Sequence, residues 1–215
     1  MKIKWKYAIG EIVIVIIGIS IAFALNNWKE GQNNRKQKKQ YLENLILDIE
    51  QEMEHLNENQ VKVQDKLKLI GAVKQHLGRK LPGRDTIVMK VFELPRLVGF
   101  NPENTTYETL INSGDMKLID NFELRRSVEK HYSKHSEIDI NYGRIEKINE
   151  NYIGDFFIHE IDFNKVRQGN IDFLDKPLLM NIVNSLEGAY YMILSSNAEG
   201  LKSNEALLEQ LKAEL

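Results

Sequence analysis

Apolar residues recur every seven positions along the stretch that follows the first thirty residues. The repeat comprises Leu42, Ile49, Leu56, Val63, Ile70 and Leu77. A helix completes a turn in about 3.6 residues, so side chains seven positions apart lie on one face. No proline interrupts the stretch. The pattern therefore predicts one long helix over residues 33–77.

The second apolar position that a coiled coil requires is mostly polar in this helix. In the same heptad frame, position d holds Leu45, Glu52, Asn59, Lys66 and Val73, and position e offers Ile46, Met53 and Leu67. A two-stranded coiled coil needs apolar side chains at both a and d. The pattern therefore favours packing inside an intrachain bundle. Self-association through a coiled coil is the alternative.

Glycine, proline and capping residues mark the boundaries of the later elements. The stretch "GRKLPGRD" (78–85) ends the first helix, and residues 86–100 fit either an extended segment or a helical turn. Thr105 and Asp120 each open a capping-box pattern that predicts a helix start, with Gly114 closing the first of these helices. The second should reach about residue 160, and its expected seam comprises Leu124, Val128, His131, His135, Ile138, Tyr142, Ile145, Tyr152 and Phe156.

The last part of the chain predicts a loop or small hairpin and then another long helix. Residues 161–173 contain Ile-Asp-Phe twice around a Gly-Asn pair, which suits a hairpin or a loop. The helix begins near Pro177, and its apolar repeat comprises Leu179, Leu186 and Ile193, followed, one residue out of phase, by Leu201, Leu208 and Leu215. We expect a kink or break between the two series, at residues 195–200. The whole pattern predicts an all-α fold with an elongated antiparallel helical bundle and at most one small hairpin.

An N-terminal transmembrane helix is expected before the bundle. Residues 8–25 form an apolar run whose only ionisable residue is Glu11, which is long enough to cross a bilayer. Trp28 at one end, and Trp5 and Tyr7 at the other, would lie in the two interfaces. The sequence therefore indicates a single-pass chain.

Two interpretations of this N-terminal run compete. Ala22-Phe23-Ala24 has the shape of a signal-peptide cleavage site, but the apolar run is longer than the usual core of a signal peptide. We therefore expect an uncleaved anchor over residues 1–31 and a soluble helical domain over residues 32–215. The short lysine-containing tail before the run favours a cytoplasmic N-terminus and a periplasmic domain.

Polar residues in the expected membrane helix allow two roles. Glu11 lies about one turn inside the span, where its carboxylate can reach the lysine-rich interface. In the other interpretation Glu11 faces further copies of the helix in a pore, and the small pair Gly18 and Ala22 lets the helices approach closely. Asn26 and Asn27 are expected at the far interface, or paired across such an oligomer.

Charge and cysteine content exclude several classes of function. The chain has 29 Lys plus Arg against 31 Asp plus Glu, so no overall positive field favours nucleic acid. It has no cysteine, which excludes disulfides, thiolate metal sites and a cysteine nucleophile. No phosphate loop or nucleophile elbow is present, so no catalysis and no cofactor are expected.

One pair of residues could bind a metal ion. His131 and His135 are four positions apart, a spacing that lets two imidazoles on one helix face hold the same ion. Glu137, Asp139 or His159 would have to complete the set. Because both histidines lie on the apolar seam, packing within the core with hydrogen-bond partners is the favoured interpretation, and a proton switch is the third.

Two stretches carry a resemblance. Residues 10–30 contain Gly10-Glu11 and close on Asn26-Asn27-Trp28, and residues 107–133 contain Tyr107, Leu110, Ser113 and Gly114 followed by Leu118-Ile119. On these motifs the chain resembles an uncharacterised family of single-pass membrane proteins of Bacteroidota, classed as a domain of unknown function. The resemblance implies a protein of the bacterial inner membrane and supplies no reaction or ligand.

The sequence as a whole favours a membrane-anchored helical interaction or sensing module. Its expected partners are the lipid bilayer and either a protein partner or further copies of itself. The alternative is a subunit of an oligomeric pore with Glu11 and Asn26 facing inward.

Overall fold

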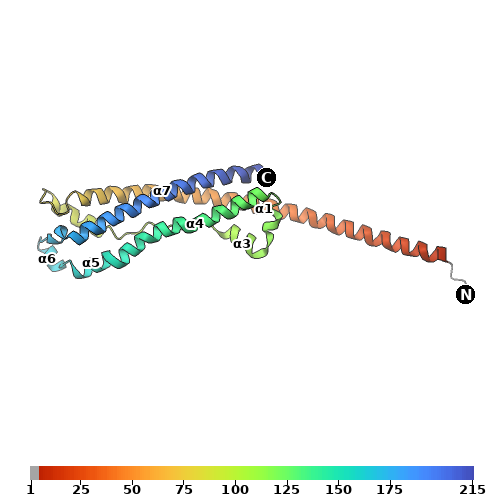
Figure 1. Ribbon diagram of the computed structural model, residues 1–215, viewed down its shortest axis with the longest axis horizontal. Helices are drawn as coiled ribbons and strands as arrows, with labels where there is room; N and C mark the ends of the chain where they lie inside the picture. The colour runs from red at the N-terminus through yellow and green to blue at the C-terminus, as the bar shows by residue number, and fades with distance from the viewer. Residues whose placement is uncertain (1–4) are drawn as a thin grey trace.

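The computed structural model describes residues 5–215, and every regular element in this range is helical (Figure 1). The α-helices are α1 (Trp5–Lys74), α2 (Val88–Phe92), α3 (Thr105–Ser113), α4 (Phe122–Ile148), α5 (Gly154–His159), α6 (Phe163–Arg167) and α7 (Pro177–Glu214). Single 3-10 turns cover Arg84–Ile87, Asp115–Leu118 and Asp172–Asp175, and a π-helical turn covers Asn149–Ile153. The all-α prediction is confirmed.

Helix α1 is one unbroken helix of 70 residues, about 105 Å long at 1.5 Å per residue. Its first part projects beyond the bundle with no other helix beside it (Figure 1). Side chains from Ile9 to Glu30 are exposed, and Leu42 is the first buried residue of the helix. Among the described residues, only α1 is long and apolar enough to cross a membrane, by length and composition. The expected boundary at residues 31 and 32 therefore falls inside a continuous helix.

The bundle is built on α1, α4 and α7, with α7 packed against both of the others (Figure 1). Helix α7 runs antiparallel to α1, because Lys74 Nζ lies 2.6 Å from Glu187 Oε2 and Lys38 Nζ lies 2.7 Å from Glu214 Oε1. The C-terminus consequently lies where α1 enters the bundle, as the sequence predicts. Helix α4 runs in the same direction as α1, which requires the chain to return along the bundle between them.

The returning chain explains two of the polar residues at heptad position d. Asn59 Nδ2 donates to the carbonyl oxygen of Gly99 at 2.7 Å, and Lys66 Nζ donates to that of Glu93 at 2.8 Å. The segment between α2 and α3 contains no helix, so its carbonyl groups need hydrogen-bond partners from outside the segment or from water. These two side chains therefore donate hydrogen bonds to the backbone of the segment that returns along α1.

The apolar core is divided into two clusters along the bundle. The cluster near the entry of α1 includes Leu42, Leu45, Ile49, Leu110, Leu124, Val128, Leu207 and Leu211. The larger cluster at the far end includes Leu56, Val63, Ile70, Ile145, Phe156, Phe173, Leu186 and Tyr190. Between them lies a layer of buried polar side chains, which includes Glu52, His131, His135 and Asn204.

The π-helical turn after α4 changes which residues face the core. The sequence seam places Tyr152 inside, but Tyr152 is exposed and Ile153 is buried. A π-helical turn adds one residue to the turn and moves the apolar face along by one position. Phe156, which follows the turn, is buried as expected.

Helix α7 is continuous from Pro177 to Glu214, so the break considered at residues 195–200 does not occur. The buried series continues every seven residues from Ile193 through Gly200 to Leu207, whereas Leu201 and Leu208 are only partly buried. A glycine occupies the core position because a Cβ there would lie 3.1 Å from Ile138 Cδ1 and 3.2 Å from Leu56 Cδ1. The apparent shift of phase comes from this close helix approach.

Both predicted capping boxes lie one residue from the observed helix starts. Helix α3 follows Asn104, and Asp48 of α1 accepts a hydrogen bond from the Thr106 backbone N–H at 3.1 Å. Helix α4 follows Asn121, whose side chain accepts from the Leu124 N–H. Asparagine is as good a cap as aspartate. At the start of α3, the side-chain acceptor for the backbone N–H is Asp48 from another helix.

Two smaller expectations concern loops. Gly114 ends α3 in a left-handed conformation, φ 72°, as expected. The hairpin considered for residues 161–173 is wrong, because this segment forms α6 and then, after Gly169 at φ 89°, begins the 3-10 turn Asp172–Asp175.

Candidate functional site

The polar layer of the bundle is centred on a carboxylate from α1. Glu52 occupies heptad position d, between the buried residues Leu45 and Val73, and its exposed fraction is 1%. The heptad that buries its neighbours carries Glu52 inward as well. A charge in such a position is costly unless other groups compensate for it.

Two histidines of α4 face this carboxylate. The Nε2 atom of His135 lies 2.9 Å from Glu52 Oε2, and the Nε2 atom of His131 lies 3.6 Å from the same oxygen. The two residues lie one turn apart on the buried face of α4, so their rings converge, and the ring centroids are 4.8 Å apart. The structure therefore brings the predicted histidine pair together, and Glu52 completes the set.

Two asparagines hold the outer atoms of this cluster. Asn204 Nδ2 of α7 donates to Glu52 Oε1 at 3.2 Å. His135 Nδ1 lies 2.9 Å from Asn104 Oδ1, the residue that precedes α3. With this partner, the His135 Nδ1–H donates to the amide oxygen, which fixes the ring and its tautomer.

That tautomer leaves a lone pair of His135 Nε2 facing the carboxylate. Glu52 Oε2, His135 Nε2 and both ring nitrogens of His131 are buried and have no hydrogen-bond partner among the protein atoms of the described residues. Two acceptors 2.9 Å apart repel each other unless a cation lies between them. The cluster can therefore hold a proton, which makes His135 an imidazolium, or a metal ion.

The pKa of Glu52 reflects two opposed effects. Burial raises the pKa of this carboxyl, whereas protonated His131 and His135, which then donate hydrogen bonds and carry positive charge beside it, lower it. The second effect is stronger, and the pKa falls to about 2. Glu52 is therefore a carboxylate, the form that binds cations, over the whole physiological range.

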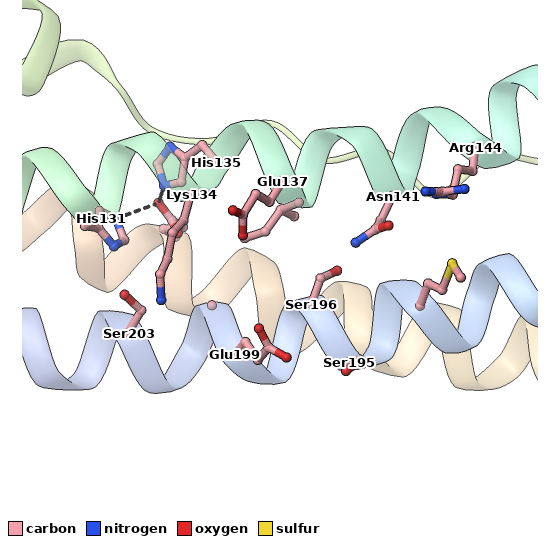
Figure 2. A pocket seen from close by; sticks show the side chains of 14 residues that line it. His131, Lys134, His135, Glu137, Asn141, Arg144, Ser195, Ser196, Glu199 and Ser203 are labelled. Atoms are coloured by element: carbon pink, nitrogen blue, oxygen red, sulfur yellow. Dashed lines mark ion pairs between the residues drawn. The ribbon is translucent and has the colours of Figure 1, made fainter.

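A cavity of about 280 Å³ opens beside the cluster, between α4 and α7 (Figure 2). Glu52, His131 and His135 form its inner end, and Glu137, Glu199 and Ser203 lie along its wall. Figure 2 shows His131 and His135 on α4, and its dashed lines mark ion pairs, which for these two histidines are with Glu52. The cavity therefore lies directly beside the cluster, whose polar atoms are themselves buried.

The donor set suits a divalent transition ion. One ligand atom from each of Glu52, His131 and His135 lies within 4.8 Å of the other two. Two imidazole nitrogens and one carboxylate oxygen form the protein part of many zinc sites that keep a further position open. The residues first considered to complete the histidine pair do not do so: Glu137, Asp139 and His159 are exposed.

The membrane candidates of the sequence lie far from this cluster. Glu11, Gly18, Ala22, Asn26, Asn27 and Trp28 all project from the free part of α1 and are exposed. No helix of the described part of the chain packs against them (Figure 1).

The motif residues of α3 lie nearer to the cluster. Leu110 is fully buried against α1, and Gly114 ends the helix, whereas Ser113 is exposed. Tyr107 stacks on Tyr132, with ring centroids 4.2 Å apart, and Tyr132 in turn contacts both histidine rings edge-on. Burial raises the pKa of Tyr132 well above its ordinary value, so its ring is neutral. Part of the motif therefore packs around the cluster.

Sequence reasoning missed Glu52 as a site residue. The available signal was its position: a carboxylate at d, in line with buried leucine and valine, must find buried partners. Asn104 and Asn204 gave no comparable signal, because only the fold shows that one loop and one distant helix meet here.

The fold and the cluster define an all-helical bundle that extends from an apolar N-terminal helix and contains a buried carboxylate–histidine site. Residues 11–158 match the model of a family described as a family of unknown function (DUF6090), and the chain belongs to this family. No curated protein and no solved structure matches the chain. The matched range contains Glu52, His131 and His135, whereas Asn204 lies beyond it.

Proposed function

We propose that this chain is a single-pass, membrane-anchored helical module that senses or interacts and does not catalyse a reaction. The observation that carries the proposal is the continuity of α1. The same helix supplies the exposed apolar residues between Ile9 and Leu25 and, further along, the buried Glu52. About 40 Å of unbroken helix separates Leu25 from Glu52, so a change in the polar layer can reach the membrane segment.

The exposed apolar side chains support anchoring. Between Ile9 and Leu25 every apolar residue is exposed, including Ile14 at 72% and Phe23 at 65%. A row of this length in water is unfavourable at about 25 cal/mol per Å², whereas a bilayer covers it. We place the segment in the inner membrane of a bacterium, with the bundle in the periplasm, as the lysine-containing tail favours.

Membrane extraction tests the anchor with the full chain. The variant Ile16→Arg/Ile17→Arg places two charges in the middle of the segment, at about 2.5–3.5 kcal/mol each, and changes no bundle residue. We expect the natural chain to stay in the membrane pellet after alkaline carbonate treatment and this variant to be released. The matched control, Leu47→Arg/Val61→Arg, changes exposed apolar residues of the bundle part of α1 and should stay in the pellet. Release of the natural chain, or a mature N-terminus after Ala24, would contradict the proposal.

The side of the membrane is tested by labelling. The chain has no cysteine, so Leu47→Cys introduces a single exposed thiol in the bundle. A maleimide that cannot cross the inner membrane should label this thiol in cells with a permeable outer membrane. Labelling only after lysis would place the bundle in the cytoplasm instead.

A pore is the second candidate function, and the geometry of α1 favours it in one respect. Glu11, Gly18, Ala22 and Asn26 fall within an arc of about 80° at 100° per residue, so they share one helix face. This face would pair polar and small residues between copies. Mass measurement of the full chain in mild detergent distinguishes the two: a monomer favours the anchor, and a fixed oligomer that Gly18→Leu dissociates favours the pore.

A further inference from the structure

We propose that Glu52, His131 and His135 form a binding site for one divalent transition-metal ion, with Zn²⁺ as the reference ion, in the centre of the bundle. The inference goes beyond membrane anchoring and does not depend on it, because all of these residues lie in the bundle.

The ligand atoms of the three residues lie close together. Glu52 Oε2 lies 2.9 Å from His135 Nε2 and 3.6 Å from His131 Nε2. Ligands that share a zinc ion at about 2.0–2.1 Å lie roughly 3–3.5 Å from one another. The three atoms come from two helices that the apolar clusters on both sides hold in place. Little movement is therefore needed to close the three atoms around an ion.

Several buried polar atoms of this cluster lack a hydrogen-bond partner among the described residues. His131 is 3% exposed, and neither of its ring nitrogens has a hydrogen-bond partner among the protein atoms of the described residues. The same holds for Glu52 Oε2 and His135 Nε2. Buried polar atoms are nearly always paired. Four unpartnered polar atoms in one cluster therefore indicate that a ligand binds there. A proton on His135 Nε2 would satisfy one contact and leave both nitrogens of His131 unpaired, whereas a metal ion would contact Glu52 Oε2 and both Nε2 atoms and leave only His131 Nδ1 without a partner among the described residues.

Two asparagines hold hydrogen bonds to the proposed ligands on the side away from the ion. Histidines that bind metal generally donate the other ring N–H to an oxygen. His135 does so toward Asn104 Oδ1 at 2.9 Å, and Asn204 Nδ2 holds the second oxygen of Glu52 at 3.2 Å. These asparagines are positioning residues, because they orient the ligands without contacting the ion.

A cavity lies beside the proposed ligands. The cavity of about 280 Å³ between α4 and α7 borders the three residues, so a water or small anion on that side could take an open position of the ion. The wall carries Glu137 and Glu199 together with Lys134 and Arg144, so these charges nearly balance and the negative charge at the inner end is that of Glu52.

Metal content of the full chain in mild detergent is the direct test, with the protein purified without a polyhistidine tag. After treatment with a chelator and desalting, the chain is incubated with Zn²⁺, desalted again and analysed by mass spectrometry for metal. We expect one Zn²⁺ per chain. The variants Glu52→Gln, His131→Gln and His135→Gln should each lose the stoichiometric ion, and Asn104→Ala should weaken binding by about tenfold to a hundredfold. The matched controls His55→Gln and His159→Gln remove exposed histidines and should bind as the natural chain does.

Cobalt spectroscopy covers the case in which a ligand variant does not fold. Co²⁺ added to the natural chain should develop visible absorption bands of a low-symmetry nitrogen and oxygen site, and Zn²⁺ should abolish them. A folded natural chain with substoichiometric Zn²⁺ and the spectrum of aqueous Co²⁺ would overturn the proposal. Equal Zn²⁺ binding by the natural chain and by folded ligand variants would also overturn it. Neither result would bear on membrane anchoring, which carbonate extraction tests separately.

Discussion

Glu52 of α1 and His135 of α4 meet in the core, with Oε2 and Nε2 2.9 Å apart and both side chains at least nine-tenths buried. This contact joins the helix that leaves the bundle toward its N-terminus to the helix that runs beside it. It also interrupts an otherwise apolar core. The interruption has consequences for stability that can be measured.

Removing the carboxylate should destabilise the bundle strongly. Glu52→Ala leaves His131, His135 and Asn204 without their central partner, and breaking a buried charged contact costs about 3–5 kcal/mol. Glu50→Ala on the same helix removes an ion pair with Lys212 whose side chains are about half exposed, so its cost should stay within about 1 kcal/mol. Urea unfolding of both variants, followed by circular dichroism, measures the contrast. Similar costs for the two substitutions would contradict the account.

Replacing the whole polar layer should have the opposite outcome. In the quadruple variant Glu52→Leu/His131→Leu/His135→Leu/Asn204→Leu, apolar side chains connect the two core clusters, and such exchanges are often neutral or stabilising by about 1–4 kcal/mol. We expect this variant to unfold at a temperature equal to or higher than that of the metal-free natural chain. A melting temperature as low as that of Glu52→Ala would show that the layer is needed for packing itself.

The contribution of Glu52 to stability should depend on pH in the acid range. The pKa of its carboxyl is about 2 in the folded chain, against an ordinary value of 4.5. The folded state therefore holds the proton more weakly than the unfolded state, and ionised Glu52 stabilises the fold above pH 4.5. This contribution is lost as the pH falls from 4.5 toward 2. Unfolding of the natural chain and of Glu52→Gln in the presence of a chelator should show a difference that narrows over this interval. A difference that does not change between pH 5 and pH 2.5 would contradict the assignment.

Helix α7 offers a paired test of close packing. A Cβ at Gly200 would lie 3.1 Å from Ile138 Cδ1, so Gly200→Val should overpack the core and cost about 1–3 kcal/mol. At Gly188 nothing lies within 4 Å of the added atom, and Gly188→Ala should stabilise the helix by about 0.5–1 kcal/mol. Thermal unfolding of both variants measures the two changes in stability, which should be opposite in sign. A destabilised Gly188→Ala or a neutral Gly200→Val would show that α7 packs differently.

The sequence predicts the long elements of this fold well and its junctions poorly. The heptad from Leu42 to Leu77 predicts the bundle part of α1 because a single face is buried along its whole length. The return of the chain beside Asn59 and Lys66 leaves no periodic signal, so the parallel course of α4 could not be predicted. Gly200 hides a core position because the close approach of three helices replaces a side chain.

The candidate site shows the same division. The spacing of His131 and His135 is visible in the sequence, since both ligands lie on one helix. Glu52 is far away in the chain, and only the fold, in which α1 and α4 both pack on α7, brings it to the histidines in preference to nearer acidic residues such as Glu137. The same packing brings Asn104 and Asn204 to the cluster from a loop and from a third helix.

The central claim is that one rigid helix joins the apolar N-terminal segment to the buried polar layer. Spin labels at Lys29→Cys and Leu47→Cys lie on either side of Gly31 on one face of α1, and the distance between them can be measured by pulsed electron paramagnetic resonance of the full chain in lipid. An unbroken helix gives a narrow distribution near 27 Å, 18 residues at about 1.5 Å each. Labels at Leu47→Cys and Val61→Cys, both within the bundle part of the helix, give the reference width. A distribution for the first pair that is much broader than this reference, or clearly shorter than about 27 Å, would show a hinge near Gly31 and contradict the claim.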